Sequence, residues 1–320
     1  MTCLKLESPA KVNLHLALLG LREDGFHELA MVMQAIDFCD ELTLEPHSGL
    51  QLHCEGLELA NDHTNLVMRA ARLLQKAFPE RQLGARIHLR KRIPLKAGLG
   101  GGSSNAAATL MGLNQLWALG LAAEELKVYG AQLGSDVPFF IAGGTQLCFG
   151  RGERLEPVAK PLGGAVLLNK RMDVSVTTAW AYGICREELA RNYLKREQAF
   201  CSARQALRRG EMVAALNRGD MATTGHLLCN QMEEVVAAQI PAVRQNLELL
   251  RQTPDCCGVS MSGSGPSVFA LFATRSAAQA AHQSLASRLR ANEIQAWVCG
   301  LREDGVRFCR DTGPETGTLP

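Results

Sequence analysis

One segment of the chain places four glycines directly before an alanine-rich stretch. Residues 94–104 read Pro-Leu-Lys-Ala-Gly-Leu-Gly-Gly-Gly-Ser-Ser, and residues 105–117 have a helix-forming composition. Glycines lack a Cβ, so successive backbone N–H groups can converge on one anion. A helix N-terminus adds unpaired donors and the positive end of its dipole. The segment therefore predicts a phosphate-binding loop that leads into a helix.

The spacing of this loop differs from that of two common phosphate loops. A Walker loop has lysine directly after its last glycine, where this chain has Ser103. A dinucleotide-binding loop would begin at Gly98 and would require glycine or alanine at Ser103. Taken by itself, the segment could also be a flexible surface loop.

Two further segments accompany the loop. Residues 8–16 read Ser-Pro-Ala-Lys-Val-Asn-Leu-His-Leu, and residues 258–269 read Gly-Val-Ser-Met-Ser-Gly-Ser-Gly-Pro-Ser-Val-Phe. In this order, the three segments resemble the signature motifs of the GHMP kinases, which include galactokinase, homoserine kinase, mevalonate kinase and phosphomevalonate kinase. The resemblance spans most of the chain. It implies an α+β fold in which an N-terminal domain like domain 2 of ribosomal protein S5 and a ferredoxin-like C-terminal domain enclose the active site.

Within this superfamily, two more segments narrow the resemblance. Residues 24–27 read Asp-Gly-Phe-His, and residues 134–140 read Gly-Ser-Asp-Val-Pro-Phe-Phe. Together with the first motif and the triple glycine, they resemble the branch that phosphorylates 4-diphosphocytidyl-2-C-methyl-D-erythritol. The resemblance implies transfer of phosphate from ATP, with Mg²⁺, to the 2-hydroxyl of this substrate in the non-mevalonate route to isoprenoid precursors.

Two charged residues are the catalytic candidates. A kinase for an alcohol needs a base near the hydroxyl and positive charge near the transferring phosphoryl group. From the sequence alone, Asp136 before Val-Pro is typical of a turn or a helix cap, and Lys11 on an apolar strand could point to solvent. The resemblance implies instead that Asp136 is the base and that Lys11 keeps its carboxylate ionised and stabilises the transition state.

The resemblance also implies which residues bind ATP. Ser103, Ser104 and Asn65 are equally well explained as helix N-caps, a role that is compatible with phosphate binding for the two serines. Lys96 replaces the small residue usual at its position and could contact phosphate or point outward. The protein ligands of the metal stay unknown. The implied ATP-binding set is Asn65, Pro94, Leu95, Lys96, Ala97, Gly98, Leu99, Gly100, Gly101, Gly102, Ser103 and Ser104.

For the substrate, the resemblance implies that an aromatic pair stacks on the two faces of the cytosine ring. Phe26 and Tyr182 would form this pair, and the His27 segment would bind the polar edge. Without the resemblance, Tyr182 is interpreted as a core residue of a helix. Residues 263–265, Gly-Ser-Gly, form a tight turn in either case and would close the site. The implied substrate-binding set is Asn13, Phe26, His27, Thr178 and Tyr182.

Hydrophobic periodicity predicts mixed strands and helices. Proline and glycines in residues 157–164 predict a domain division, giving domains 1–163 and 164–320, and the polar tail from residue 302 is expected to fray. Strands are expected at residues 4–7, 12–19, 41–44, 50–54, 85–92, 143–152, 165–168, 257–261, 267–272 and 295–300. Helices are expected at residues 65–78, 105–117, 122–133, 177–209, 241–251 and 277–290.

The composition bears on cellular location and partners. With 320 residues, 47% hydrophobic residues and a formal net charge of +2, the chain is expected to be globular, without a nucleic-acid or membrane surface. Its 11 scattered cysteines lack a Cys-x-x-Cys spacing, which favours reduced thiols. With no apparent leader or long apolar span, a cytoplasmic bacterial enzyme is expected, as a monomer or homodimer that binds a small molecule.

Three alternatives remain open. A related kinase for another small alcohol would keep the three motifs but lack the cytosine pocket. A dinucleotide-binding protein would need an acidic ribose-binding residue after the next strand, yet the helical run after Ser104 passes into a second helix. A non-catalytic nucleotide-binding relative is disfavoured by the presence of both Lys11 and Asp136.

Overall fold

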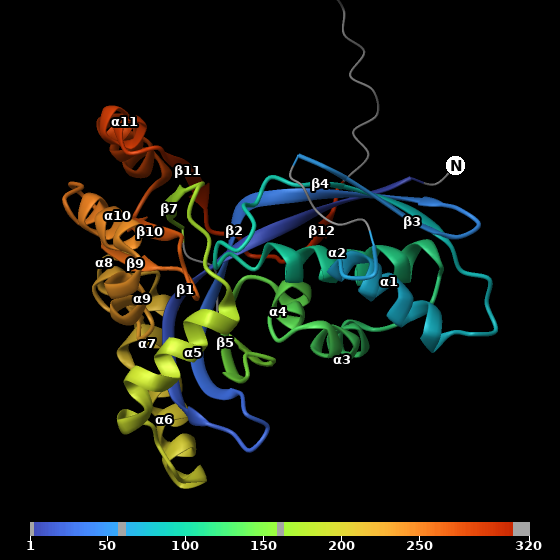
Figure 1. Cartoon of the computed structure of the whole chain (residues 1–320), viewed down its shortest axis with the longest axis horizontal. Helices are drawn as coiled ribbons and strands as arrows, with labels where there is room; N and C mark the ends of the chain where they lie inside the picture. The colour runs from blue at the N-terminus through green and yellow to red at the C-terminus, as the bar shows by residue number, and fades with distance from the viewer. Residues whose placement is uncertain (1–2, 57–61, 159–162, 310–320) are drawn as a thin grey trace, which may run out of the picture.

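The computed structural model describes residues 3–56, 62–158 and 163–309, which form two sheets and their covering helices (Figure 1). Mixed α and β structure was expected, and the α+β fold class is confirmed. The strands are β1 (Leu4–Leu21), β2 (His27–Pro46), β3 (Leu50–Glu55), β4 (Ala85–Arg90), β5 (Thr145–Gly150), β6 (Arg154–Pro157), β7 (Ala165–Arg171), β8 (Cys229–Asn230), β9 (Gly258–Met261), β10 (Val268–Phe272), β11 (Ile294–Gly300) and β12 (Arg307–Phe308). The helices are α1 (Leu66–Ala77), α2 (Gly101–Leu116), α3 (Ala123–Leu133), α4 (Val137–Ala142), α5 (Thr178–Leu189), the short 3₁₀ helix η1 (Ala190–Asn192), α6 (Glu197–Arg209), α7 (Glu211–Arg218), α8 (Met221–His226), α9 (Glu233–Gln239), α10 (Pro241–Arg251) and α11 (Arg275–Ala291).

The first sheet is organised around a long antiparallel pair, β1 and β2. In the described residues its strand order is β12-β1-β2-β4-β3, with β5 and β6 added beside β2 and β8 beside β1. The expected strands at 4–7 and 12–19 are one strand, and its register shifts directly after Pro9, where a bulge accommodates a residue without an N–H. Much of β2 was missed, because residues 27–36 are buried on both faces and show no period-two alternation.

Helices cover one face of this sheet (Figure 1). Helix α2 packs against β1 and β2, α1 packs against α2, and α3 and α4 lie beside them. Helix α2 is buried over most of its length, which explains its alanine-rich and weakly amphipathic sequence. The helix that follows the glycine-rich loop is therefore part of the core.

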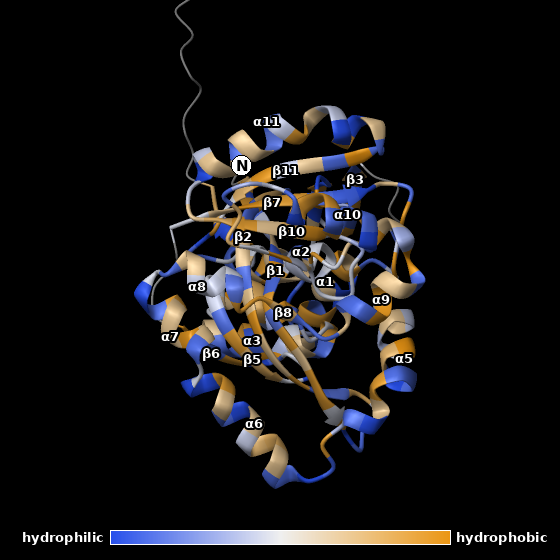
Figure 2. Cartoon of the chain, turned by 90° about the vertical axis from the view of Figure 1, so that its left-hand side faces the viewer, coloured by the Kyte–Doolittle hydropathy of each residue, from blue (hydrophilic) through white to orange (hydrophobic). Residues whose placement is uncertain are grey.

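The second sheet has the antiparallel order β11-β7-β10-β9. Helices α10 and α11 pack on one of its faces, so β7-α10-β9-β10-α11-β11 forms the β-α-β-β-α-β arrangement of a ferredoxin-like fold, as expected. Figure 2 shows apolar residues along these strands and polar residues on the covering helices. The expected continuous helix over residues 177–209 is interrupted after η1, and α7, α8 and α9 were not anticipated.

A shared hydrophobic core joins the two sheets. Ala10, Val12 and Leu14 of β1 belong to the same buried cluster as Leu168 and Phe269 of the second sheet. Alternate side chains of β1 therefore face the second sheet, and the residues between them face the opposite side. This alternation decides where the polar residues of the first motif lie.

The chain returns to the first sheet after β11. We call residues Leu301–Cys309 the C-terminal return segment. Arg302 donates its backbone N–H to the Ala35 carbonyl at 2.9 Å, and Val306 donates to the Phe140 carbonyl of α4 at 2.8 Å. Strand β12 then pairs with β1. The expected division at residue 163 follows residues 159–162, which lie outside the described residues, as does most of the expected tail, so the domain boundaries stay a prediction.

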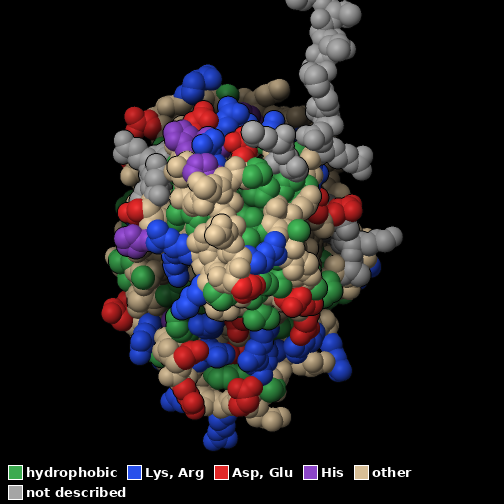
Figure 3. Space-filling model, turned by 90° about the vertical axis from the view of Figure 1, so that its right-hand side faces the viewer, with side chains coloured by type: hydrophobic (Ala, Val, Ile, Leu, Met, Phe, Trp, Pro, Cys, Tyr) green, Lys and Arg blue, Asp and Glu red, His purple; other side chains and the backbone are tan. Residues whose placement is uncertain are grey.

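The described surface is mixed in charge. On the face that Figure 3 shows, acidic and basic side chains are interspersed. The 11 cysteines, all in the described ranges, form no disulfide with one another. Among the helices that the structure describes, none combines the length and the apolar character needed to cross a membrane.

Candidate active site

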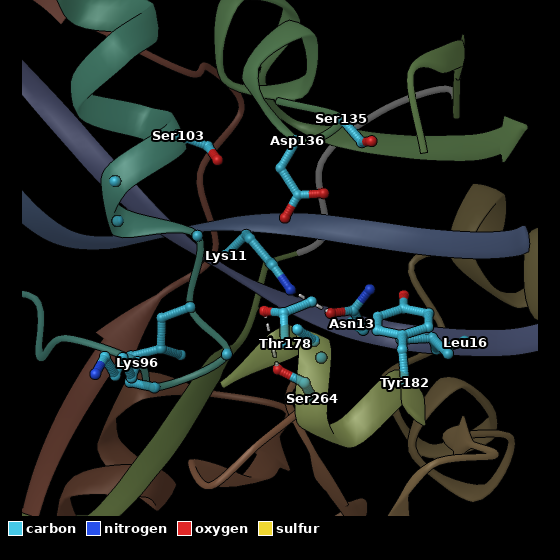
Figure 4. A pocket seen from close by; sticks show the side chains of 18 of the residues that line it. Lys11, Asn13, Leu16, Lys96, Ser103, Ser135, Asp136, Thr178, Tyr182 and Ser264 are labelled. Atoms are coloured by element: carbon cyan, nitrogen blue, oxygen red, sulfur yellow. Dashed lines mark hydrogen bonds between the residues drawn. The ribbon is translucent and has the colours of Figure 1, made fainter. Parts of the chain in front are cut away.

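A cavity of about 880 Å³ lies where the glycine-rich loop, β1, β2, α5 and the turn after β9 meet (Figure 4). Most of the predicted site residues line it. Two do not: the side chains of Asn65 and Ser104 lie elsewhere. The predicted residues that line the cavity are Lys11, Asn13, Phe26, His27, Pro94, Leu95, Lys96, Ala97, Gly98, Leu99, Gly100, Gly101, Gly102, Ser103, Asp136, Thr178 and Tyr182, joined by Gly263 and Ser264 of the turn.

The glycine-rich loop presents unpaired donors. Its carbonyl groups are occupied: that of Leu99 accepts from the Lys11 backbone N–H at 3.0 Å, and that of Gly98 accepts from the Ser262 hydroxyl at 3.0 Å. By contrast, the backbone N–H groups of residues 98–103 have no hydrogen-bond acceptor within the described part of the chain. A loop with satisfied acceptors and free donors at a helix N-terminus is built to bind an anion.

The turn after β9 packs against this loop. Gly98 has a φ of +73°, and a Cβ at this position would collide with the Ser262 carbonyl oxygen. A Cβ on Gly263 would lie 2.9 Å from the Lys11 ammonium. Asn230 of β8 holds the turn by donating to the carbonyls of Met261 at 2.7 Å and Gly263 at 2.9 Å. The expected tight turn thus closes one side of the cavity.

Lys11 and Asn13 project from the face of β1 opposite to Ala10, Val12 and Leu14. Lys11 is only 4% exposed, so the solvent-facing alternative is wrong. Its Nζ donates to Asn13 Oδ1 at 2.5 Å, and Asn13 Nδ2 lies 3.6 Å from the Met31 sulfur. Burial lowers the pKa of Lys11, while the negative charge of Asp136 opposes this shift.

Asp136 precedes α4, and its carboxylate points into the cavity toward the side of Lys11 (Figure 4). Asp136 occupies the N-cap position of α4, as the sequence alone indicated, but its side chain makes no capping hydrogen bond. In the described residues no ion pair of 4.0 Å or less joins Asp136 to Lys11, whose ammonium bonds Asn13. The carboxylate is therefore free to accept a hydrogen bond from a bound hydroxyl.

The two serines after the loop have different environments. Helix α2 begins at Gly101 with Gly100 as its N-cap, so neither serine caps the helix and that alternative is wrong. Ser103 faces the cavity (Figure 4). Ser104 is fully buried and accepts a hydrogen bond of 2.8 Å from the Ser8 hydroxyl. Of the two, only Ser103 is placed to approach a ligand.

Asn65 and Lys96 lie at the margins of the nucleotide region. Asn65 caps α1, since its Oδ1 accepts from the Val67 N–H at 3.0 Å, and the following residue, Leu66, lines the cavity in its place. The exposed Lys96 has a φ of +49°, and its ammonium is directed away from Lys11 and Asp136 (Figure 4). A contact of either residue with ATP stays a prediction.

An aromatic group lies at the other end of the cavity. The ring of His27 is 5.2 Å from that of Tyr182, centroid to centroid, with an interplanar angle of 45°. Phe26 is 53% exposed, and the Arg151 guanidinium lies 4.9 Å from its ring centroid. Burial lowers the pKa of His27, helped by the positive charge of Arg186. Stacking of cytosine between Phe26 and Tyr182 stays a prediction.

Sequence reasoning missed several residues of the cavity. Arg151, Arg186 and Lys91 line the cavity. The Lys91 ammonium lies close to Gly101 and pairs with the buried Asp40. Arg151 stands between two glycines, a pattern that could have drawn attention to it. The other two occur in ordinary strand-end and helix sequence, which gives no signal.

The chain matches the family models described as GHMP kinases N terminal domain, over residues 65–144, and GHMP kinases C terminal, over residues 212–291. The fold agrees: a solved homoserine kinase from Cytophaga hutchinsonii is similar to this chain with a TM-score of 0.73 at 22% identity, covering 97% of this chain and 98% of that one. The fold and the site thus define a GHMP kinase, a class that uses ATP as its phosphate donor.

Closer relatives narrow the class. The 4-diphosphocytidyl-2-C-methyl-D-erythritol kinase of Synechococcus sp. (strain CC9605) is 50% identical over 308 residues, which cover 95% of this chain and 98% of the relative. A crystal structure of 4-(cytidine 5'-diphospho)-2C-methyl-D-erythritol kinase is 33% identical, with a TM-score of 0.72 and coverage of 93% of this chain and 98% of that one. The chain belongs to the family of 4-diphosphocytidyl-2-C-methyl-D-erythritol kinases.

Proposed function

We propose that this chain transfers the γ-phosphoryl group of ATP to the 2-hydroxyl of 4-diphosphocytidyl-2-C-methyl-D-erythritol. The observation that carries the proposal is the cavity itself. It has free N–H donors at one end, an aromatic pocket at the other, and Lys11 and Asp136 between them. This order matches the phosphates of ATP, the reacting alcohol and the cytosine ring of the substrate, placed one after another along the cavity.

In this proposal, the backbone N–H groups of residues 98–103 bind the phosphates of ATP. Asp136 accepts the proton of the substrate hydroxyl as its oxygen attacks the γ-phosphorus. The bond between the γ-phosphorus and the bridging oxygen breaks, and ADP leaves with the electron pair. Lys11 places positive charge beside the transferring group and stays oriented through Asn13.

Mg²⁺ fits the chemistry of this cavity. The described residues contain no cluster of three or more histidine, cysteine or acidic side chains that could hold a metal by themselves. A magnesium ion that is bound mainly by phosphate oxygens and water needs only one or two protein oxygens, and the Ser103 hydroxyl and Asp136 carboxylate face the cavity. When bound, Mg²⁺ would neutralise charge on the phosphates.

The proposed substrate would lie with its cytosine near Phe26, His27 and Tyr182 and its methylerythritol end near Asp136. Thr178 and Ser264, whose hydroxyl oxygens are 3.5 Å apart, would contact the region between them. The side chains that would hold the cytosine come from Phe26, from His27 at the start of β2 and from Tyr182 of α5. Asp136, which would accept the proton, precedes α4. The site therefore needs both halves of the chain.

The test is ATP consumption with Mg²⁺ in the presence of the cytidylyl substrate, mevalonate, homoserine or galactose. We expect turnover with the cytidylyl substrate alone. Turnover with another of these alcohols would keep the class of enzyme but refute the proposed substrate. No turnover with any of them would favour a non-catalytic nucleotide-binding protein.

A matched pair of variants tests the proposed base. We expect Asp136→Asn to lower turnover by about 10²- to 10⁴-fold, because general-base catalysis contributes that much, while the affinity for ATP is retained. Asp173→Asn, which changes an exposed carboxylate outside the cavity, should leave both quantities unchanged. Near-normal turnover of Asp136→Asn would remove Asp136 from the role of base.

A further inference from the structure

Tyr193, which the sequence did not single out, contacts His27 from behind the aromatic pocket. It follows η1, and its hydroxyl oxygen lies 2.8 Å from His27 Nε2 and 3.1 Å from the carbonyl oxygen of Cys185. The rings of His27 and Tyr193 meet edge to face, with centroids 5.4 Å apart. Tyr193 thus links the first residue of β2 to the backbone of α5.

The hydrogen atoms of this link can be counted. A phenol carries one proton and a carbonyl oxygen can only accept, so the proton of Tyr193 is directed to Cys185. The phenol oxygen must then accept a hydrogen bond from His27 Nε2. A neutral His27 consequently carries its proton on Nε2 and a free lone pair on Nδ1.

The surroundings keep both groups in these protonation states. Burial and the positive charge of Arg186 lower the pKa of His27, which favours the neutral ring. Burial raises the pKa of Tyr193 to about 12, so the phenol keeps its proton. Within the described residues Nδ1 of His27 makes no hydrogen bond, although the residue lines the cavity. An acceptor is left without a partner beside the proposed cytosine pocket.

We propose that Tyr193 is a positioning residue that holds His27 in the acceptor form at Nδ1, and that the site thereby prefers cytosine to uracil. Cytosine presents an exocyclic amino group, which donates, where uracil presents a carbonyl oxygen, which accepts. An acceptor fixed at Nδ1 can bond the amino group of cytosine, whereas it offers no hydrogen to the carbonyl oxygen of uracil. This inference rests on the proposed function, because it assumes that His27 meets the base of a cytidylyl substrate.

The experiment compares Tyr193→Phe with the wild-type full chain. Phenylalanine keeps the edge-to-face ring contact and removes only the hydroxyl, after which His27 can protonate either nitrogen. The matched control is Tyr129→Phe on α3, since the hydroxyl of Tyr129 makes no hydrogen bond in the part of the chain that the structure describes and lies outside the cavity. Each protein is assayed with the cytidylyl substrate and with its uridylyl analogue.

For Tyr193→Phe we expect KM for the cytidylyl substrate to rise about 3- to 10-fold, the range for one lost hydrogen bond, with kcat and KM for ATP nearly unchanged. The preference for cytidylyl over uridylyl substrate, as a ratio of kcat/KM values, should fall by a similar factor. Tyr129→Phe should match the wild type. An unchanged preference in Tyr193→Phe, or an equal loss in both variants, would overturn the proposal.

Nitrogen NMR of the histidine ring separates this inference from the proposed function. In the ligand-free wild type, the His27 signals, identified by their loss in His27→Asn, should show a neutral ring protonated at Nε2. In Tyr193→Phe they should shift toward a mixture of the two tautomers. A wild-type ring protonated at Nδ1 would refute the role of Tyr193, whatever the enzyme phosphorylates. If the ring carries its proton on Nε2 but the cytidylyl substrate is not turned over, only the proposed substrate is refuted.

Discussion

A Cβ at Gly100 would collide with Phe140 of α4 and come close to Lys11. Gly100 has a φ of +70°, and the added carbon would lie 2.7 Å from the ring of Phe140 and 3.3 Å from Cγ of Lys11. Phe140 is fully buried in α4, the helix that Asp136 precedes. The substitution Gly100→Ala is therefore expected to separate the loop from Asp136.

The size of the effect follows from these distances. Ordinary carbon contacts begin near 3.4 Å, so the loop and α4 must move apart by roughly 0.7 Å. A misplacement of about 1 Å can cost about 100-fold in rate, so we expect kcat/KM to fall by about 10- to 100-fold. The left-handed backbone adds about 1–2 kcal/mol of destabilisation, partly offset by about 0.4–1 kcal/mol from a less flexible unfolded chain.

Gly120→Ala is the matched control. Gly120 has a φ of +74°, and a Cβ there would meet no atom within 4 Å. Both variants therefore share the backbone cost, and only Gly100→Ala carries the collision. Steady-state kinetics and thermal unfolding are measured for both. If Gly100→Ala stays within about threefold of Gly120→Ala in kcat/KM, the loop and α4 are not coupled as argued here.

Three further predictions concern residues with ionisable side chains. Lys11→Met should depress turnover more than affinity for ATP. Because burial lowers the pKa of Lys11 in the folded state, the unfolded chain binds more protons between that pKa and about pH 10.4. The stability of the wild type relative to the variant, measured in denaturant titrations, should therefore rise as the pH approaches about 10.4. KM for the cytidylyl substrate should stay constant from pH 8 to about 6.5 and rise only at lower pH, because burial places the pKa of His27 below its usual value; an increase already above pH 7 would contradict a neutral His27. Arg302→Met should lower the free energy of unfolding by about 2 kcal/mol, since Arg302 is buried and forms an ion pair with Glu7. Arg307 is exposed and pairs with the same carboxylate, so Arg307→Met should lower the free energy of unfolding by less than about 1 kcal/mol. Equal losses in the two variants would refute the role of burial.

The glycine-rich loop was predictable because local chemistry determines it, whereas Lys11 and Asp136 were proposed as catalytic residues only through the resemblance to the GHMP kinases. Glycines before a helix present N–H groups wherever the helix packs, and the alternation of β1 places Lys11 and Asn13 on one face. The exact start of α2 was not predictable. It depends on Gly100 adopting a left-handed conformation beneath Phe140, and that contact joins residues 40 positions apart.

Other features escaped the sequence because only tertiary packing creates them. Much of β2 lacks alternation, since it is covered by helices on one side and by the second sheet on the other. Tyr193 resembles any tyrosine in a polar helical stretch until α5 and β2 bring its hydroxyl to His27. Ser104 was expected at the phosphates, yet the burial of α2 turns it toward Ser8.

The C-terminal return segment has a consequence for how the chain is made. Until residues 301–309 leave the ribosome, the N-terminal end of β1 lacks its β12 neighbour, and α4 lacks the N–H of Val306. A growing chain would contain the glycine-rich loop and Asp136 long before it contained the turn after β9, which packs against the loop, and Val306, which bonds α4. Phosphoryl transfer should therefore begin only after residue 309 has emerged, and a gene split near residue 163 should yield two inactive halves whose activity appears only on mixing.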